Sequence, residues 1–279
     1  MSPPGNTEQG MIKTFLEAAV EIAQEAGNVL REEIERPPTI AYKGDFDLVT
    51  QADRRSEQII VSRLQQRFPH HAVAAEEGTG KDTGSEYRWH VDPLDGTTNF
   101  AHGYPCFCVS MALARKDELL LGVIFNPIHQ ELFTAARGEG AACNGTRIYC
   151  SKIEALKNSL LCTGFPNHKR LENPNIHYYW DFTLRSHGVR RDGSAALDLA
   201  YVAMGRFDSF WEFGLNPWDT AAGVLLVEEA GGRVTDLQGQ PYTLGGSSIL
   251  ASNGLIHGEM VAVAAEIAGR PLSQKFTAS

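Results

Sequence analysis

The feature that most constrains the fold is a short apolar segment that runs directly into Asp92-Pro93-Leu94-Asp95-Gly96-Thr97-Thr98. Pro93 restricts Asp92 to an extended backbone, and Gly96 allows the chain to turn sharply. Thr97 then offers a hydroxyl and unpaired N–H groups of the kind found at a helix start. This motif therefore predicts a strand that ends at two carboxylates, followed by a tight turn and a helix.

The same motif predicts a site for a phosphate and divalent cations. The N–H groups at a helix start bind phosphate, whereas Asp92 and Asp95 repel it unless cations lie between them. Mg²⁺ suits this arrangement because it takes oxygen ligands and bridges to substrate phosphates. A bare Asp-x-x-Asp pair is more typical of a helix cap or a turn. The added proline, glycine and two threonines make the motif far more specific.

Other acidic residues lie where elements are expected to begin or end. Glu76 and Glu77 follow the apolar stretch 72–75, while Asp53 and Asp219 lie near expected helix starts. Each has an ordinary structural explanation, as a solvated loop acid for the glutamates and as a helix cap for the aspartates. The residues alone leave both that explanation and a role in the site open.

Hydrophobic patterning divides the chain into two halves. We expect a loose tail over residues 1–10, an N-terminal α+β half over 11–150 and a C-terminal α/β half over 151–279. The halves should share an interface because no Gly/Ser linker separates them. The patterns predict helices over 11–35, 52–68, 193–204, 218–229 and 259–268, and strands over 88–92, 107–114, 119–125, 131–136 and 249–252.

Composition excludes several other classes of protein. The 279 residues correspond to about two domains, and the net charge of −9 argues against a general nucleic-acid binder. We expect no membrane span, because no run of 18 apolar residues occurs. The chain start does not resemble a signal peptide. Five cysteines, an odd number, favour a reducing cytoplasm over a disulfide framework.

Three motifs together resemble those of the inositol monophosphatase family, a group of Mg²⁺-dependent, lithium-sensitive sugar phosphatases, and look closest to its bacterial inositol-1-monophosphatases. They are residues 89–100, the segment Trp218-Asp219-Thr220-Ala221-Ala222-Gly223 with 229–232, and residues 193–200. The resemblance covers roughly residues 11–270. It implies a layered α/β/α/β/α sandwich, a site between the two halves and a homodimer.

The resemblance also implies two to three Mg²⁺ ions and their ligands. Glu76, Asp92 and the backbone carbonyl of Leu94 are expected to hold the first ion. The second is expected on Asp92, Asp95 and Asp219. Glu76 should also help to hold a third, mostly hydrated ion.

Catalytic and substrate-binding roles follow from the same resemblance. Thr97 is expected to bind the nucleophilic water, with Asp53 and Glu76 as partners in removing its proton. Lys43 lies near a family lysine, with a spacing one residue short. Arg191 is a candidate either for the substrate or for a surface salt bridge. The substrate-binding residues implied are Leu94, Asp95, Gly96, Thr97, Arg191, Gly193, Ser194, Ala195, Glu212 and Asp219.

The activity implied is hydrolysis of a phosphate monoester, with myo-inositol 1-phosphate as the expected substrate. Alternatives on the same fold are a fructose-1,6-bisphosphatase, a histidinol-phosphatase and a 3′-phosphoadenosine-5′-phosphate phosphatase. A bisphosphate would need a second anion pocket, for which Arg191, Lys169 and Arg170 are candidates. An alternative of another class is an accessory protein in transcription. Residues 165–187 are open to three interpretations, namely a substrate entrance, a dimer contact or a plain surface helix.

Overall fold

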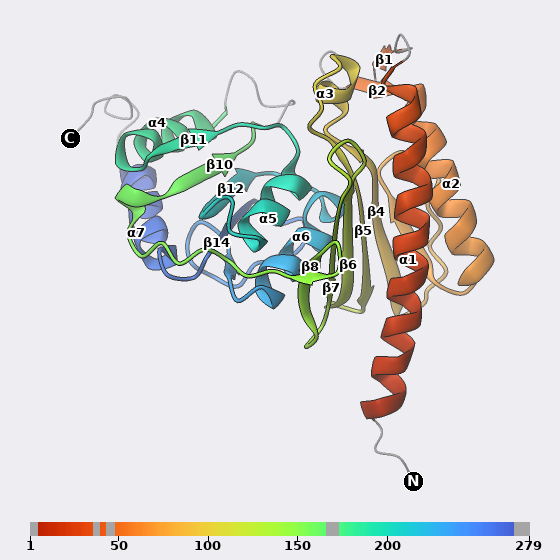
Figure 1. Ribbon diagram of the computed structural model, residues 1–279. Helices are drawn as coiled ribbons and strands as arrows, with labels where there is room; N and C mark the ends of the chain where they lie inside the picture. Colours follow the sequence, from red (N-terminus) through yellow and green to blue (C-terminus); the bar gives the residue numbers. More distant parts are fainter. Residues whose placement is uncertain (1–4, 36–39, 43–47, 166–172, 271–279) are drawn as a thin grey trace.

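The computed structural model describes residues 5–35, 40–42, 48–165 and 173–270. They form five layers, in the order helices, sheet, helices, sheet, helices (Figure 1), which confirms the expected α/β/α/β/α sandwich. The helices are α1 (Gly5–Glu33), α2 (Gln51–Arg67), α3 (Thr97–Ala101), η1 (Leu156–Asn158), α4 (Asn175–Arg185), α5 (Ala195–Ala203), α6 (Pro217–Glu229) and α7 (His257–Gly269). The strands are β1 (Ile40–Tyr42), β2 (Leu48–Thr50), β3 (Ala72–Ala75), β4 (Tyr87–Asp95), β5 (Cys108–Arg115), β6 (Glu118–Asn126), β7 (Glu131–Ala136), β8 (Gly140–Cys143), β9 (Thr146–Arg147), β10 (Leu160–Thr163), β11 (Gly188–Arg190), β12 (Ser209–Phe213), β13 (Arg233–Thr235) and β14 (Ser248–Ser252).

Helices α1 and α2 cover the outer face of the larger sheet (Figure 1). The apolar stripe of α1 is buried there, as Ile22 and Leu30 illustrate. Helix α1 begins at Gly5 rather than at residue 11, so residues 5–10 of the expected tail 1–10 are helical. The guanidinium of Arg115 donates a hydrogen bond to Glu8, which ties this first part of the helix to the sheet.

The larger sheet contains β3 to β9 in sequential order. Strand β3 pairs with β4 in parallel, and β4 pairs antiparallel with β5. In that second pair, Asp92 faces Ser110 and Asp95 faces Cys108, so β4 carries one extra residue between the two acids. Residues three apart in a regular strand point to opposite faces, and a bulge redirects one of them. The bulge therefore changes the direction of Asp95 relative to Asp92.

Helices α5 and α6 fill the space between the two sheets (Figure 1). They belong to the C-terminal half of the sequence, yet α6 packs on β5 and β6 of the N-terminal half. A Cβ atom at Gly122 on β6 would lie 2.8 Å from the carbonyl oxygen of Ala222 on α6. Glycine therefore permits the helix to approach the strand closely, and the two halves share this buried layer.

The smaller sheet has the strand order β11-β10-β12-β14-β13 and mixes parallel with antiparallel pairs. Helices α4 and α7 cover its outer face (Figure 1). The alternation of strands and helices expected after residue 150 is observed. Within the segment 165–187, residues 175–185 form α4, which buries Phe182 but leaves Trp180 43% exposed.

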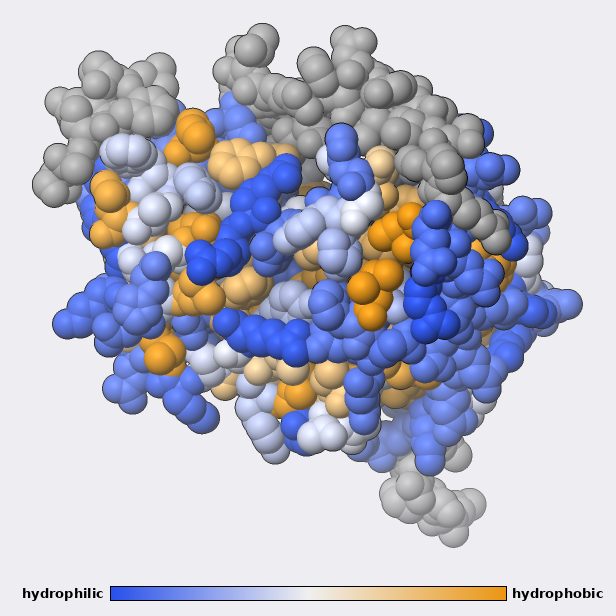
Figure 2. Space-filling model, turned by 45° about the horizontal axis from the view of Figure 1, so that its top comes forward, coloured by the Kyte–Doolittle hydropathy of each residue, from blue (hydrophilic) through white to orange (hydrophobic). Residues whose placement is uncertain are grey.

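Hydrophilic residues cover most of the surface that Figure 2 shows, and hydrophobic residues reach it in scattered patches. Single exposed apolar residues of this kind are ordinary on folded proteins. Among the described helices, none has both the length and the apolar character needed to cross a membrane.

Candidate active site

The end of β4 brings the first acid of the site into the interior. Asp92 is only 2% exposed, and its Oδ1 accepts a hydrogen bond from the N–H of Leu94 at 3.0 Å. Between them, the carbonyl oxygen of Pro93 accepts a hydrogen bond from Ser56 on α2 at 2.8 Å. The backbone after Asp92 is therefore fixed by its own carboxylate and by a neighbouring helix.

The second acid, Asp95, joins the two halves of the chain. Its Oδ2 accepts hydrogen bonds from the Ser194 hydroxyl and from the N–H of Ala196, both at 2.7 Å. Ser194 is also the N-cap of α5, where its hydroxyl accepts a bond from Leu197 N–H. Burial raises the pKa of Asp95, while these hydrogen bonds oppose the rise.

Gly96 and Thr97 form the turn that starts α3, as the motif predicted. Gly96 has φ of 99°, and a Cβ atom there would lie 2.8 Å from the carbonyl oxygen of Cys106. Both facts require glycine at this position. The Thr97 hydroxyl lies 2.9 Å from Oδ1 of Asp53 and 3.1 Å from the carbonyl oxygen of Leu94, and its single proton is directed to one of these acceptors.

Asp53 caps α2, as one of its two interpretations predicted, and it also contacts the turn of Gly96 and Thr97. It is the third residue of α2 and forms a capping box with Thr50, whose N–H donates to Oδ2 of Asp53 at 2.8 Å. Its other oxygen accepts the bond from Thr97. The side chain is fully buried, and this burial raises the pKa of Asp53 against the effect of its hydrogen bonds.

Two further acids reach the same place from other elements. Glu76 follows β3, and Asp219 is the third residue of α6, where it accepts a hydrogen bond from Asn216 N–H at 2.7 Å. The pKa of Asp92 lies well above its usual value, first because of burial and then because of Glu76, with which it shares a hydrogen bond. We call Glu76, Asp92, Asp95 and Asp219 the acidic cluster.

The acidic cluster carries more negative charge than its surroundings neutralise. Burial and then the charge of Asp95 raise the pKa of Asp219 to about 8. Within the described part of the chain, no three His, Cys, Asp or Glu side chains already converge as a set of metal ligands. The charge of Glu76 raises the pKa of Asp92, as expected for two carboxylates that are close together in a buried place, and a divalent cation between them would offset that repulsion. The donor set consists of oxygens only, which fits Mg²⁺, an ion that needs few carboxylates besides water and phosphate.

Glu212 lies on β12 and is 6% exposed. The pKa of Glu212 lies well above its usual value because of burial and then Asp219 and Asp95, whereas Arg191 lowers it. Gly164 leaves room for this carboxylate, because a Cβ atom there would lie 2.1 Å from Oε2 of Glu212. Glu212 is therefore within electrostatic range of the acidic cluster but comes from the smaller sheet.

The loop before α5 lies against α3. Asn99 Nδ2 donates to the carbonyl oxygens of Asp192 and Cys106, both at 2.7 Å. A Cβ atom at Gly193 would lie 3.1 Å from the Asn99 amide, and Gly193 has φ of 84°. Gly193, Ser194 and Ala195 thus begin α5 directly beside the turn of Gly96 and Thr97.

Fewer contacts define the surroundings of the positively charged residues that are candidates for binding the substrate. Arg191 is exposed and takes part in no ion pair within the described residues. Its charge nevertheless acts on Glu212 and Asp198. The other candidates, Lys43, Lys169 and Arg170, lie outside the described residues.

Sequence reasoning missed three buried polar residues around the site. They are Asn99, Asp198 and Glu57, which are 9%, 1% and 0% exposed. Asn99 and Asp198 stand inside the quoted motifs, but nothing in the residue pattern gave them a contact. Glu57 follows Asp53 by four residues on α2, and that spacing was the available signal because it places both on one helix face.

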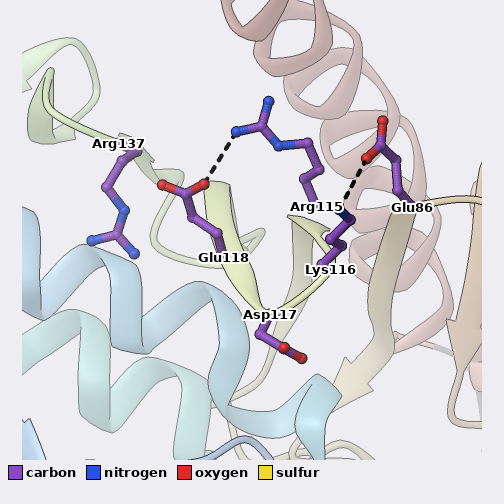
Figure 3. A pocket seen from close by; sticks show the side chains of 6 residues that line it. All are labelled: Glu86, Arg115, Lys116, Asp117, Glu118 and Arg137. Atoms are coloured by element: carbon purple, nitrogen blue, oxygen red, sulfur yellow. Dashed lines mark hydrogen bonds and ion pairs between the residues drawn. The ribbon is translucent and has the colours of Figure 1, made fainter.

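The pocket in Figure 3 is separate from the acidic cluster. It lies at the hairpin between β5 and β6, at the end of β5 opposite to Cys108, roughly 20 Å away for a strand of this length. Figure 3 shows Arg115 directed at Glu118 and Lys116 at Glu86, and Arg137 pairs with Glu228 outside the view. Because these cations are paired with carboxylates, the pocket does not offer the positive charge that a phosphate needs.

Comparison with known proteins gives concordant matches. The inositol monophosphatase family model matches residues 11–269. Nus factor SuhB of Pseudomonas aeruginosa is 45% identical over 250 residues, which cover 87% of this chain and 92% of that protein. An inositol-1-monophosphatase of Synechocystis is 46% identical over 253 residues, which cover 89% and 88%. The solved inositol monophosphatase of Anabaena (Nostoc) is 44% identical, with a TM-score of 0.84 and coverage of 94% of this chain and 98% of that one.

Proposed function

We propose that this chain, which belongs to the inositol monophosphatase family and is a phosphoric monoester hydrolase, acts on myo-inositol 1-phosphate. The observation that carries the proposal is the meeting of the acidic cluster with the turn of Gly96 and Thr97 and with Glu212. The acids attract divalent cations, and the turn offers N–H groups to a phosphate. Glu212 offers hydrogen-bond acceptors to ring hydroxyls. Each part of a phosphorylated polyol therefore has a partner.

The family is generally metal-dependent, and we assign two to three Mg²⁺ ions to the acidic cluster. Glu76, Asp92 and the carbonyl of Leu94 would hold the first, and Asp92, Asp95 and Asp219 the second. Glu76 would share a third. When bound, Mg²⁺ supplies positive charge that offsets the phosphate dianion and makes water more acidic.

Thr97 and Asp53 would position the attacking water and receive its proton. The Thr97 hydroxyl accepts a hydrogen bond from water while it donates to Asp53 Oδ1 at 2.9 Å. The N–H of Thr50 donates to the other oxygen of Asp53 at 2.8 Å and so orients Oδ1 toward Thr97. Because burial raises its pKa, Asp53 is a better proton acceptor than an exposed aspartate. Glu76 is the second candidate acceptor.

The polyol would bind where the N-terminal half, residues 11–150, meets the C-terminal half, residues 151–279. Gly193, Ser194 and Ala195 are assigned to it because α5 begins beside the phosphate turn. Glu212 would orient the ring through its hydroxyls. Arg191 is assigned to a substrate hydroxyl or a second anionic group, supported by its effect on the pKa of Glu212.

The same site chemistry leaves other phosphate esters as alternatives. Fructose 1,6-bisphosphate and 3′-phosphoadenosine-5′-phosphate each carry a second anionic group, for which Arg191 is the described candidate. Histidinol phosphate instead carries a cationic amine, which would suit Glu212. The substrate panel given below separates these cases.

A second candidate function is an accessory role in transcription. It is favoured by the similarity to a relative named Nus factor SuhB, because the matched region covers 92% of that protein. The net charge of −9 points to a protein partner rather than to direct contact with RNA. Such a role would survive Asp95→Asn, so capture of transcription proteins by that variant would support it, and no capture would contradict it.

Three further properties belong to the proposal. We assign the protein to the cytoplasm, because five cysteines without a disulfide framework suit a reducing compartment. A homodimer and inhibition by lithium rest on the family resemblance alone.

Phosphate release from a substrate panel tests the proposed function. The panel contains myo-inositol 1-phosphate, fructose 1,6-bisphosphate, histidinol phosphate and 3′-phosphoadenosine-5′-phosphate, each with and without Mg²⁺. We expect Mg²⁺-dependent release with the highest kcat/KM on myo-inositol 1-phosphate. Preference for another ester would replace the substrate and keep the reaction class, whereas Mg²⁺-independent release would contradict the proposed chemistry.

A further inference from the structure

Glu57 is a fully buried carboxylate whose contacts all lead to one turn. Its Oε2 accepts a hydrogen bond from Glu77 N–H at 2.7 Å. Its Oε1 accepts from the N–H and the hydroxyl of Thr79, at 2.9 and 2.7 Å. Its side chain is 0% exposed, and no ion pair to it occurs in the described regions of the chain. A buried charge is costly unless hydrogen bonds satisfy it, so these three bonds account for its presence.

The turn that Glu57 holds is the one that carries Glu76. Glu76 N–H donates to the carbonyl oxygen of Val91 at 3.2 Å, and the next N–H, that of Glu77, donates to Glu57. Gly78 has φ of 86° and completes the turn with a bond to Ala75. The backbone around Glu76 is thus held at two successive N–H groups, by β4 at Glu76 and by α2 at Glu77.

Helix α2 supports the site at three points from a single face. Asp53, Ser56 and Glu57 are all 0% exposed, and their spacing of three and four residues places them side by side. Asp53 accepts from Thr97, Ser56 donates to Pro93, and Glu57 accepts from the turn after Glu76. The first two contacts hold the segment from Asp92 to Thr97, and the third holds the turn after Glu76.

We propose that Glu57 is a positioning residue that fixes Glu76 and thereby sets the affinity of the acidic cluster for Mg²⁺. This inference rests on the proposed function, because it assigns Glu76 to the metal. Carboxylate bonds to backbone N–H groups are among the stronger hydrogen bonds in proteins. Residues that orient a metal ligand without touching the metal commonly change metal affinity by about 10- to 100-fold when mutated.

Glu57→Gln tests the inference with little change in volume. The glutamine amide places an NH₂ group opposite either Glu77 N–H or the Thr79 donors, so the turn loses part of its support. We expect the Mg²⁺ concentration for half-maximal activity to rise about 10-fold. The kcat at saturating Mg²⁺ should stay within about threefold, because the reacting groups are intact. Without turnover, the Mg²⁺ concentration that half-saturates the rise in Tm should shift by the same factor.

The matched control is Glu229→Gln. Glu229 also accepts two backbone bonds from one turn, at 2.9 Å from Gly138 and 2.8 Å from Gly140. That turn precedes β8, away from the acidic cluster. The control should lose stability as Glu57→Gln does but keep the wild-type Mg²⁺ midpoint.

Thr79→Val keeps the test decisive if Glu57→Gln does not fold. It removes one bond to Glu57 from an exposed residue, so we expect a smaller shift of the Mg²⁺ midpoint in the same direction. Thr79→Ser should restore the wild-type value.

The outcomes distinguish the inference from the function on which it rests. A wild-type enzyme that depends on Mg²⁺, together with variants at Glu57 and Thr79 that keep its midpoint, would overturn the positioning role alone. A wild-type protein that responds to Mg²⁺ neither in activity nor in Tm would overturn the proposed function and the inference together.

Discussion

Ser194 donates a 2.7 Å hydrogen bond to Oδ2 of Asp95, although 99 positions separate them in the chain. The same hydroxyl caps α5, and the N–H of Ala196 donates to the same carboxylate oxygen. The end of β4 and the start of α5 are therefore joined by two hydrogen bonds to the same oxygen, Oδ2 of Asp95. One acid of the acidic cluster thus depends for its orientation on the other half of the chain.

Removal of this hydroxyl should affect activity and stability together. We expect Ser194→Ala to lower kcat/KM about 10-fold, within the range for groups that orient metal ligands. Loss of the N-cap should cost about 1 kcal/mol in the free energy of unfolding. Steady-state kinetics and urea unfolding measure the two effects. Ser159→Ala is the control, because its buried hydroxyl bonds Leu156 away from the site; an unchanged kcat/KM in Ser194→Ala would contradict the coupling.

Thr97 offers a direct test of the proposed transfer of the water proton toward Asp53. Thr97→Val has the same shape without the hydroxyl and should lower kcat by about 10²- to 10⁴-fold, the range for acid–base groups. Thr97→Ser retains the hydroxyl and should stay within about 10-fold of wild type. Both are compared at saturating Mg²⁺ and substrate. Equal activity in the two variants would show that the hydroxyl bonded to Asp53 plays no part.

A substitution at Gly164 tests the proposed role of Glu212 in recognising the polyol. Gly164→Ala would place a Cβ atom 2.1 Å from Oε2 of Glu212 and displace that carboxylate. A bond to a charged group contributes about 1.5 to 3 kcal/mol, so kcat/KM for myo-inositol 1-phosphate should fall roughly 10- to 100-fold. p-Nitrophenyl phosphate lacks ring hydroxyls and should be much less affected.

The ratio of these two substrates is the informative quantity. Gly258→Ala serves as the control, because a Cβ atom there would meet nothing within 4 Å. An equal loss on both substrates in Gly164→Ala would count against an assignment of Glu212 to the ring.

We expect the protein to lose stability in acid because of the buried His257, independently of the active site. His257 is 1% exposed, and its ring nitrogens pair with Thr235 Oγ1 at 2.9 Å and Ser252 Oγ at 2.8 Å. Burial, and then the charge of Arg233, lower the pKa of His257 to about 4 from 6.5. Between these values the unfolded chain binds a proton that the folded chain does not. Stability therefore falls as the pH drops from about 6.5 to about 4.

The difference between these two pKa values of His257 corresponds to a contribution of about 3 kcal/mol to stability across that range. Urea unfolding of wild type and His257→Gln at pH 7.5, 5.5 and 4.5 isolates it. The wild type should lose more stability than the variant as the pH falls. Parallel losses in the two proteins would contradict the assignment.

Local sequence signals predicted the strand, the turn and the helix start around Asp92, although β4 runs to Asp95 rather than to the expected residue 92. Pro93, Gly96 and Thr97 each have a backbone requirement that acts over one or two residues, so the strand, the turn and the helix start were readable. The positions of Glu76 and Asp219 at element ends were readable for the same reason. Their convergence on Asp92 was not, because it depends on how distant elements pack.

The hydrogen bonds that hold the segments around the site could not be predicted from the sequence in the same way. Glu57 and Asn99 act through hydrogen bonds to backbone atoms 7 to 93 positions away. Every residue has a backbone acceptor and every residue except proline has a backbone donor, so these groups leave no mark on composition or periodicity. The helical start of α1 at Gly5 was missed for a related reason, since Arg115 on a distant strand holds Glu8.

The central claim is that the acidic cluster holds Mg²⁺ for the hydrolysis of myo-inositol 1-phosphate. Its most direct test is phosphate release from this ester across a Mg²⁺ titration, for wild type and Asp95→Asn. We expect no release from wild type in EDTA, release that saturates with Mg²⁺, and a loss of at least about 100-fold in a folded Asp95→Asn. Near-wild-type turnover by Asp95→Asn at saturating Mg²⁺ would contradict the account.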